Sequence, residues 1–178
     1  NGDSMISILT GANGIFTPQD ICEKEHLFEN TGYCLIQSEI PLDTMREACR
    51  MAHKYHAKTI VKPSACSSMT REMLADIDII IPNEDELFEL CSMLECVISA
   101  VIVTLREKGC YVKTKDWEQY FSAADFSAVD KTGASDAFIS ALASYLLYGY
   151  DLKKAVRIAT YAAGFCISRE GVVPALID

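Results

Sequence analysis

Short runs of Val, Ile and Leu alternate with helical patterns along this chain, and the alternation restricts its fold more than any single motif. Four runs are mostly apolar and have the length of a strand, at residues 33–37, 58–62, 77–81 and 100–105. Between them, residues 41–56 are the clearest helix, because apolar residues recur there every three or four positions. Nearly continuous apolar strands separated by helices are typical of a mostly parallel sheet with helices on both faces. We therefore expect a three-layer α/β/α fold that forms one domain over residues 1–178.

Weaker patterns complete the expected order of elements. Thr17 and Pro18 indicate the start of a short helix, and Asp151 is placed as the N-cap of a helix that extends to about Ser168. Further helices are expected at residues 69–75, 83–93 and 137–148. Further strands are expected at residues 5–10 and 110–113, with short strand-like pieces around residues 120–121 and 126.

The net charge and the cysteines exclude several classes of protein. The chain carries a net charge of −9 and no basic stripe, so nucleic acid and anionic membranes are not expected partners. No apolar run is long enough to span a bilayer, and no signal peptide is visible. Eight cysteines occur without a C-x-x-C pair. Reduced, buried thiols in a cytoplasmic protein are the favoured interpretation, ahead of a disulfide framework or a zinc site.

The segment V-D-K-T-G-A-S-D-A-F at residues 129–138 has the chemistry of an anion site. Small residues at the start of a helix leave main-chain N–H groups without partners, and the helix dipole adds positive potential there. Asp136 beside such a site is suited to take the proton of a hydroxyl while the N–H groups hold a phosphoryl group. The alternative is an ordinary helix N-cap, because Ser, Thr and Asp begin many helices.

Two common nucleotide-binding motifs are missing from the sequence. Neither the G-x-x-x-x-G-K-[ST] loop nor the G-x-G-x-x-G fingerprint occurs. The second absence argues against a generic dinucleotide-binding α/β domain. A nucleotide would therefore have to be bound by another arrangement.

Six motifs, in order, resemble the C-terminal part of the ribokinase-like, PfkB-type carbohydrate kinases. The most specific is D-K-T-G-A-S-D-A-F at residues 130–138, while the N-x-x-E element within P-N-E-D-E is weak by itself. The motifs are G-A-N at 11–13, L-I-Q-S-E-I-P at 35–41, P-N-E-D-E at 82–86, V-T-L-R-E-K-G at 103–109, D-K-T-G-A-S-D-A-F at 130–138 and S-R-E-G at 168–171. The resemblance covers essentially the whole chain. It implies a ribokinase-like fold whose N-terminal half, with a sugar-binding Gly-Gly element and a small β lid, lies outside this chain.

The resemblance implies catalytic roles for the turn at residues 133–136, the catalytic turn. Asp136 matches the base that accepts the proton of the sugar hydroxyl. Gly133, Ala134 and Ser135 match the N–H groups of the anion hole around the transferred phosphoryl group.

It also implies a nucleotide and magnesium site. Asn83 and Glu86 match the N-x-x-E pair that organises Mg²⁺ and its waters near the phosphates, although the same two residues would form a capping box at a helix start. Thr104 and Gly109 match a strand end and a turn that line the nucleotide, and Thr160 is expected near adenine. Thr104 could equally be an ordinary β-branched strand residue.

Three further residues are assigned through the resemblance. Glu39 matches an acidic position that contacts sugar hydroxyls, although a solvated residue before a proline is an equal interpretation. Asp130 and Gly171 match positions around a monovalent-cation site, which would hold K⁺.

The chain departs from the family pattern at three positions of its motifs. Ser135 replaces a glycine and restricts φ in the anion hole. Lys131 replaces a threonine and either adds positive charge near the phosphates or points to solvent. Arg106 replaces a glycine, where it could clamp a phosphate or be exposed to solvent.

Together these features predict an ATP-dependent sugar or nucleoside kinase that transfers the γ-phosphoryl group of ATP. The alternative is a nucleotide- or metabolite-binding regulatory module without turnover. If strands are missing from one side of the sheet, an edge is exposed, so we also expect this chain to pair with itself as a homo-oligomer.

Overall fold

The computed structural model describes residues 8–64, 66–90, 92–93 and 98–176, and its centre is one six-stranded sheet. The strands lie in sequence order, β1-β2-β3-β4-β5-β6. Their bounds are Tyr33–Gln37 (β1), Lys58–Lys62 (β2), Ile79–Ile80 (β3), Ala100–Thr104 (β4), Gly109–Thr114 (β5) and Glu118–Ser122 (β6). Strands β1 to β4 are parallel, and β5 runs antiparallel to both of its neighbours, β4 and β6. The predicted mostly parallel sheet is confirmed.

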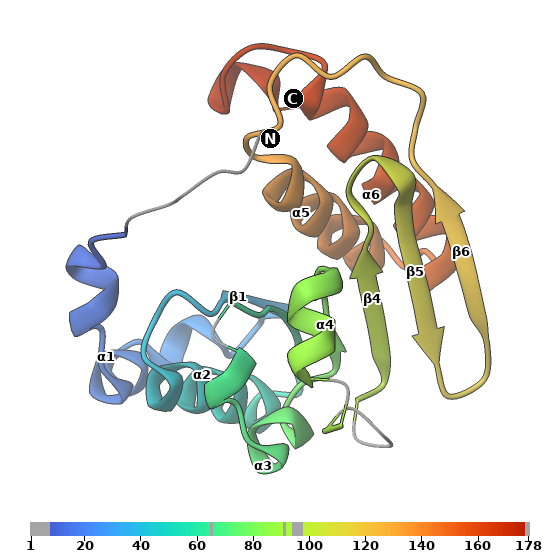
Figure 1. Ribbon diagram of the computed structural model, residues 1–178. Coiled ribbons are helices and arrows are strands. Elements are labelled where there is room, and N and C mark those ends of the chain that lie inside the picture. Colours follow the sequence, from blue (N-terminus) through green and yellow to red (C-terminus); the bar gives the residue numbers. More distant parts are fainter. Residues whose placement is uncertain (1–7, 65, 91, 94–97, 177–178) are drawn as a thin grey trace.

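Helices cover both faces of this sheet (Figure 1). The α-helices are Pro18–Glu23 (α1), Leu42–Lys54 (α2), Arg71–Ala75 (α3), Glu84–Leu90 (α4), Ala134–Leu147 (α5) and Leu152–Ile167 (α6). Short 3₁₀ turns lie at Gly11–Ile15, Glu25–Leu27, Cys66–Ser68, Arg106–Lys108 and Val173–Ala175. Helices α5 and α6 pack together on one face, whereas α1 to α4 belong to the other (Figure 1).

The apolar strands supply two separate cores, one for each face. Side chains along a strand alternate between the faces, so neighbours in β2 enter different cores. Ile60 packs with residues of α5 and α6, whereas Val61 packs with residues of α2 and α3, and both are fully buried. This explains why the strands are apolar throughout instead of alternating with polar residues.

Three elements differ from the sequence prediction. The strand expected at residues 5–10 is not observed: residues 5–7 lie outside the described residues, and residues 8–10 have no strand structure. Helix α5 begins at Ala134, three residues earlier than predicted, because Gly133 adopts a left-handed conformation (φ 82°) and serves as its N-cap. Phe126 is not in a strand; its ring packs edge-on against Tyr161 and Phe165 of α6.

Two predicted helix starts are confirmed by their hydrogen bonds. The Thr17 side chain accepts a hydrogen bond from the main-chain N–H of Asp20, and the Asp20 carboxylate accepts one from the N–H of Thr17. This is a capping box at the start of α1. At α6, the Asp151 carboxylate accepts a bond of 3.0 Å from the N–H of Lys154.

The cysteines in the described part of the chain are free thiols, and most of them are buried. Cys49, Cys66, Cys110 and Cys166 are buried, while Cys22 and Cys34 are partly buried. Burial raises the pKa of Cys34 to about 11 and is the main reason that the pKa of Cys49 rises to about 12. These two groups therefore remain protonated, unreactive thiols at neutral pH. Over the same part of the chain, no helix combines the length and the hydrophobicity needed to cross a bilayer.

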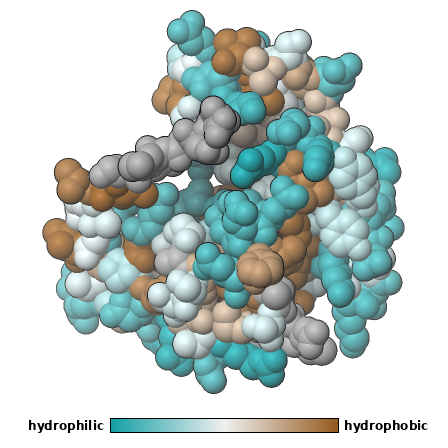
Figure 2. Space-filling model, in the orientation of Figure 1, coloured by the Kyte–Doolittle hydropathy of each residue, from teal (hydrophilic) through white to brown (hydrophobic). Residues whose placement is uncertain are grey.

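Strand β1 is an edge of the described sheet, with only β2 beside it. Its Leu35 side chain is 46% exposed. Hydrophobic side chains also gather at the surface of the N-terminal segment in Figure 2, where Ile8, Leu9 and Ile15 are exposed. An exposed edge strand beside apolar surface is a template for pairing with another chain.

We predict that this chain self-associates through β1. Leu35→Lys should shift the species measured by light scattering toward monomer, because a charged side chain on an edge strand opposes pairing. Val173→Lys is the matched control, since it places the same charge on an exposed apolar position after α6. A wild-type chain that is monomeric at all concentrations would contradict the prediction.

Candidate active site

Polar residues end the first two parallel strands and link them to neighbouring elements. Gln37 ends β1, and its amide Nε2 donates a hydrogen bond of 2.7 Å to Oδ1 of Asp136 in α5. Lys62 ends β2, and its Nζ lies 2.5 Å from Oε2 of Glu86 in α4. Ligands of open α/β sheets bind outside the carboxyl ends of the strands, so this row of polar contacts is the candidate site.

Helix α5 begins at this edge without a side-chain cap. Its N-cap is Gly133 (φ 82°), and within the described residues no side chain caps it by a hydrogen bond. A Cβ atom at this position would lie 3.1 Å from Cγ1 of Val172, so both the conformation and the packing favour glycine. Ala134 and Ser135 follow in the first turn, and Ser135 is exposed. The main-chain N–H groups predicted to form an anion hole therefore lie at a helix terminus that has no side-chain cap.

Asp136 lies on the same first turn of α5, and its side chain is exposed. It lines a small pocket between β1 and α5 together with Leu35, Ile139 and Ser140. The hydrogen bond from Gln37 ends on one carboxylate oxygen and thereby orients the group. The structure thus places a carboxylate in the first turn of α5, beside the N–H groups that the motif predicts to form an anion hole.

Asn83 and Glu86 form the capping box that the sequence left open as an alternative. The N–H of Glu86 donates to the Asn83 side chain at 2.8 Å, and the N–H of Asn83 donates to Oε2 of Glu86 at 2.7 Å. Thr104 lies beside Asn83, to which it is joined by an isolated parallel bridge. The structure therefore brings Asn83, Glu86 and Thr104 together at the ends of β3 and β4.

Glu86 fits a magnesium site poorly, because one of its two carboxylate oxygens is already used. Mg²⁺ usually keeps several waters and is bound through one or two carboxylates and substrate phosphates. Here Oε2 of Glu86 already accepts bonds from Lys62 and from the N–H of Asn83. Within the described residues no group of three or more His, Cys, Asp or Glu side chains is arranged to hold a metal ion.

Asp130 and Gly171 are also brought together, through a hydrogen bond between the Asp130 side chain and the Gly171 main chain. The Asp130 carboxylate accepts hydrogen bonds from the N–H groups of Thr132 at 2.9 Å and Gly171 at 3.3 Å. The bond from Thr132 is the main cause that lowers the pKa of Asp130 below its usual value. Asp130 thus ties the loop before α5 to the loop after α6, and its oxygens are used by main-chain donors.

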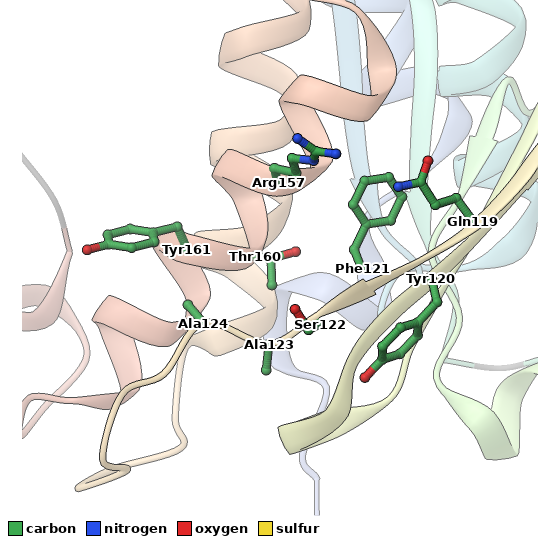
Figure 3. A pocket seen from close by; sticks show the side chains of 9 residues that line it. All are labelled: Gln119, Tyr120, Phe121, Ser122, Ala123, Ala124, Arg157, Thr160 and Tyr161. Carbon is green, nitrogen blue, oxygen red and sulfur yellow. The ribbon is translucent and has the colours of Figure 1, made fainter.

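The remaining predicted residues do not line the pocket that contains Asp136. Gly109 begins β5 with φ 109°, and a Cβ there would lie 2.1 Å from the carbonyl oxygen of Phe121, so the hairpin requires glycine. Thr160 is buried and donates to the carbonyl oxygen of Val156; it lines a different pocket, between α6 and β6 (Figure 3). Glu39 is exposed two residues beyond β1 and does not line the pocket that contains Asp136.

The unusual residues of the motifs are tolerated at the surface. Arg106 has a left-handed backbone (φ 53°), the conformation expected where a glycine is usual, and its Nη2 lies 3.7 Å from Oδ2 of Asp85. Both of these side chains are largely exposed, so the pair adds little stability. Lys131 is also exposed.

Sequence analysis missed Gln37 and Lys62. Both were read only as the last residues of strands, yet they touch the two acidic side chains of the site. The available signal was their position, because a polar residue that ends a buried parallel strand lies at the ligand-binding edge.

This fold and site define a class: an α/β protein in which a helix N-terminus and an exposed carboxylate lie together at the carboxyl edge of the sheet. The particular family follows from comparison. The chain matches the pfkB family carbohydrate kinases over residues 1–177 and belongs to that family.

Similar proteins agree with this assignment. The chain is 29% identical to the ribokinase of Staphylococcus aureus and 28% identical to the deoxyribokinase of Salmonella typhi, and each match covers 96% of this chain and 61% of the relative. Among solved structures, Arabidopsis thaliana ribokinase complexed with ribose and ATP is 26% identical, with a TM-score of 0.88. That match covers 100% of this chain and 63% of the ribokinase. The chain thus spans about three fifths of the length of these proteins.

The backbone of Arg106 generates a stability prediction. Arg106→Gly should raise the free energy of unfolding by about 1 kcal/mol, because a left-handed conformation costs a non-glycine residue roughly 1–2 kcal/mol. Lys108→Gly in the same 3₁₀ turn lacks a positive φ and should lower it by about 0.5–1 kcal/mol. Urea denaturation measures both. Equal destabilisation by the two changes would show that Arg106 is not strained.

Proposed function

We propose that this chain is the nucleotide-binding and catalytic part of an ATP-dependent sugar kinase, with Asp136 as the base. One observation carries the proposal: an exposed carboxylate, oriented by Gln37, shares the first turn of α5 with N–H groups that no side chain caps. Such N–H groups are suited to stabilise the charge on a transferred phosphoryl group.

The proposed step is an in-line phosphoryl transfer. The acceptor hydroxyl gives its proton to Asp136, and its oxygen forms a bond to the γ-phosphorus of ATP. The bond between that phosphorus and the β–γ bridging oxygen breaks, and ADP leaves with the electron pair. The N–H groups of Gly133, Ala134 and Ser135 steady the equatorial oxygens of the phosphoryl group. Catalysis is then a matter of positioning and electrostatics.

Other predicted residues take supporting roles in the proposal. Thr104 and Gly109 line the nucleotide, and Thr160 contributes to an adenine pocket next to Arg157 and Tyr161 (Figure 3). The proposal for Thr160 draws support from a pocket wall shared by α6 and β6. Glu39 contacts sugar hydroxyls from the exposed end of β1.

No proposed step passes through Mg²⁺ or K⁺. Glu86, the residue predicted to organise magnesium, is paired with Lys62. The Asp130 carboxylate, predicted near a monovalent cation, accepts two main-chain N–H groups.

D-Ribose and 2-deoxy-D-ribose are the first substrates to test, because the relatives include proteins named ribokinase and deoxyribokinase. Turnover is to be measured with the 178-residue chain and with any longer polypeptide that contains it, since the chain spans about three fifths of those relatives. We place the activity in the cytoplasm, in keeping with the free thiols of the described cysteines. Nucleotide binding without turnover in both samples would instead favour a regulatory module.

The role of Asp136 predicts a specific loss of rate. Asp136→Asn should lower kcat by about 10²–10⁴-fold, the usual contribution of a positioned acid or base. Nucleotide affinity should change little, because the anion-binding N–H groups remain. The measurement is ADP formation with ribose or deoxyribose, beside a nucleotide titration.

Asp125→Asn is the matched control, because Asp125 is an exposed aspartate in the loop that precedes the catalytic turn. It should retain wild-type turnover. Full activity of Asp136→Asn would refute the assignment of the base.

A further inference from the structure

Lys62 occupies a position that the family motifs do not assign. It is the register partner of Gln37, the residue that holds Asp136. Register partners in a parallel pair project to the same face of the sheet, about 4.8 Å apart. Lys62 and Gln37 therefore lie side by side on one face of the sheet, and Gln37 holds the candidate base.

The ammonium group of Lys62 forms an ion pair with Glu86, the acidic residue of the N-x-x-E element. Its Nζ lies 2.5 Å from Oε2 of Glu86 and also donates to the carbonyl oxygen of Pro63 at 3.2 Å. The two side chains are 13% and 16% exposed, which makes this the least exposed ion pair in the described part of the chain. A pair with so little solvent contact is costly to break by removing one partner.

This pair conflicts with a magnesium site at Glu86. Oε2 of Glu86 already accepts bonds from Lys62 and from the N–H of Asn83, so this oxygen is not free to accept one from a metal-bound water. The ammonium group of Lys62 thus lies beside Glu86, where the family resemblance implies a magnesium ion. Lysine also binds phosphate as a point charge.

We propose that Lys62 is a phosphate-binding residue that replaces magnesium at Glu86. In the free chain its ammonium neutralises Glu86, and in the nucleotide complex it contacts a phosphate oxygen of the bound nucleotide. This inference rests on the proposed nucleotide binding. Its consequence is that nucleotide affinity depends on Lys62 and only weakly on Mg²⁺.

The test is calorimetric titration of the chain with ADP, once in EDTA and once in excess magnesium chloride. Lys62→Met should weaken ADP binding in EDTA by about tenfold or more, the usual effect of losing a charged hydrogen bond. Mg²⁺ should change the affinity of the wild-type chain by less than about threefold. It should strengthen binding to Lys62→Met by about tenfold, because Glu86 is then free to organise the metal.

Two further variants make the result specific. Lys58→Met removes the same charge from the first residue of β2, at the other end of the same strand. This variant should behave as wild type. The double variant Lys62→Met with Glu86→Gln removes both charges and so avoids an unpaired carboxylate if the single variant folds poorly. It should bind ADP weakly in both solutions, because it has neither the lysine nor the carboxylate.

Each contrary outcome has one meaning. Equal ADP affinity of wild type and Lys62→Met in EDTA overturns the proposal, and so does an equal effect of Mg²⁺ on the two. A matching loss in Lys58→Met overturns it as well, because net charge alone would then explain the effect. If the wild-type chain binds no ADP in either solution, the inference and the proposed nucleotide site both fail.

Discussion

The site depends on the unpaired main-chain N–H groups at the start of α5. They exist because Gly133 starts the helix in a left-handed conformation and no side chain in the described part of the chain caps it. A larger residue would meet Val172 and would be strained at this φ. The proposed phosphoryl transfer requires these N–H groups to be accessible beside Asp136.

Packing holds that terminus at the edge of the sheet. Helix α5 lies against α6 and contributes to the same core as alternate residues of β2, β3 and β4. Asp130 then joins the loops before α5 and after α6 through two main-chain N–H groups. Gln37 reaches from β1 to Asp136, so the orientation of the carboxylate is coupled to the end of a buried strand. The turn at residues 133–136 is thus held by α6, by the loops on either side of the helix pair and by β1, not by its own residues alone.

Periodicity and turn chemistry predicted the sheet and the helices, because they depend on local sequence. The motif at residues 130–138 predicted a small-residue turn that leads into a helix, although α5 begins at Ala134 and not at Ala137. The contacts of Gln37 and Lys62 could not be predicted, because they join residues 99 and 24 positions apart. Whether Asn83 and Glu86 cap a helix or organise a metal was equally open in the sequence, since both arrangements use the same spacing. Lys62 bears on which role Glu86 can take, because the two side chains form an ion pair. Lys62 lies on β2, outside the N-x-x-E element.

The central claim is that the main-chain amides of the α5 terminus bind a phosphate. It is tested most directly by two-dimensional amide NMR of the ¹⁵N-labelled chain, titrated with a non-hydrolysable ATP analogue. The account predicts saturable shifts of the amide signals of Gly133, Ala134, Ser135 and Asp136. If these four signals stay in place while others in the chain shift, or if no signal responds, the claim is contradicted.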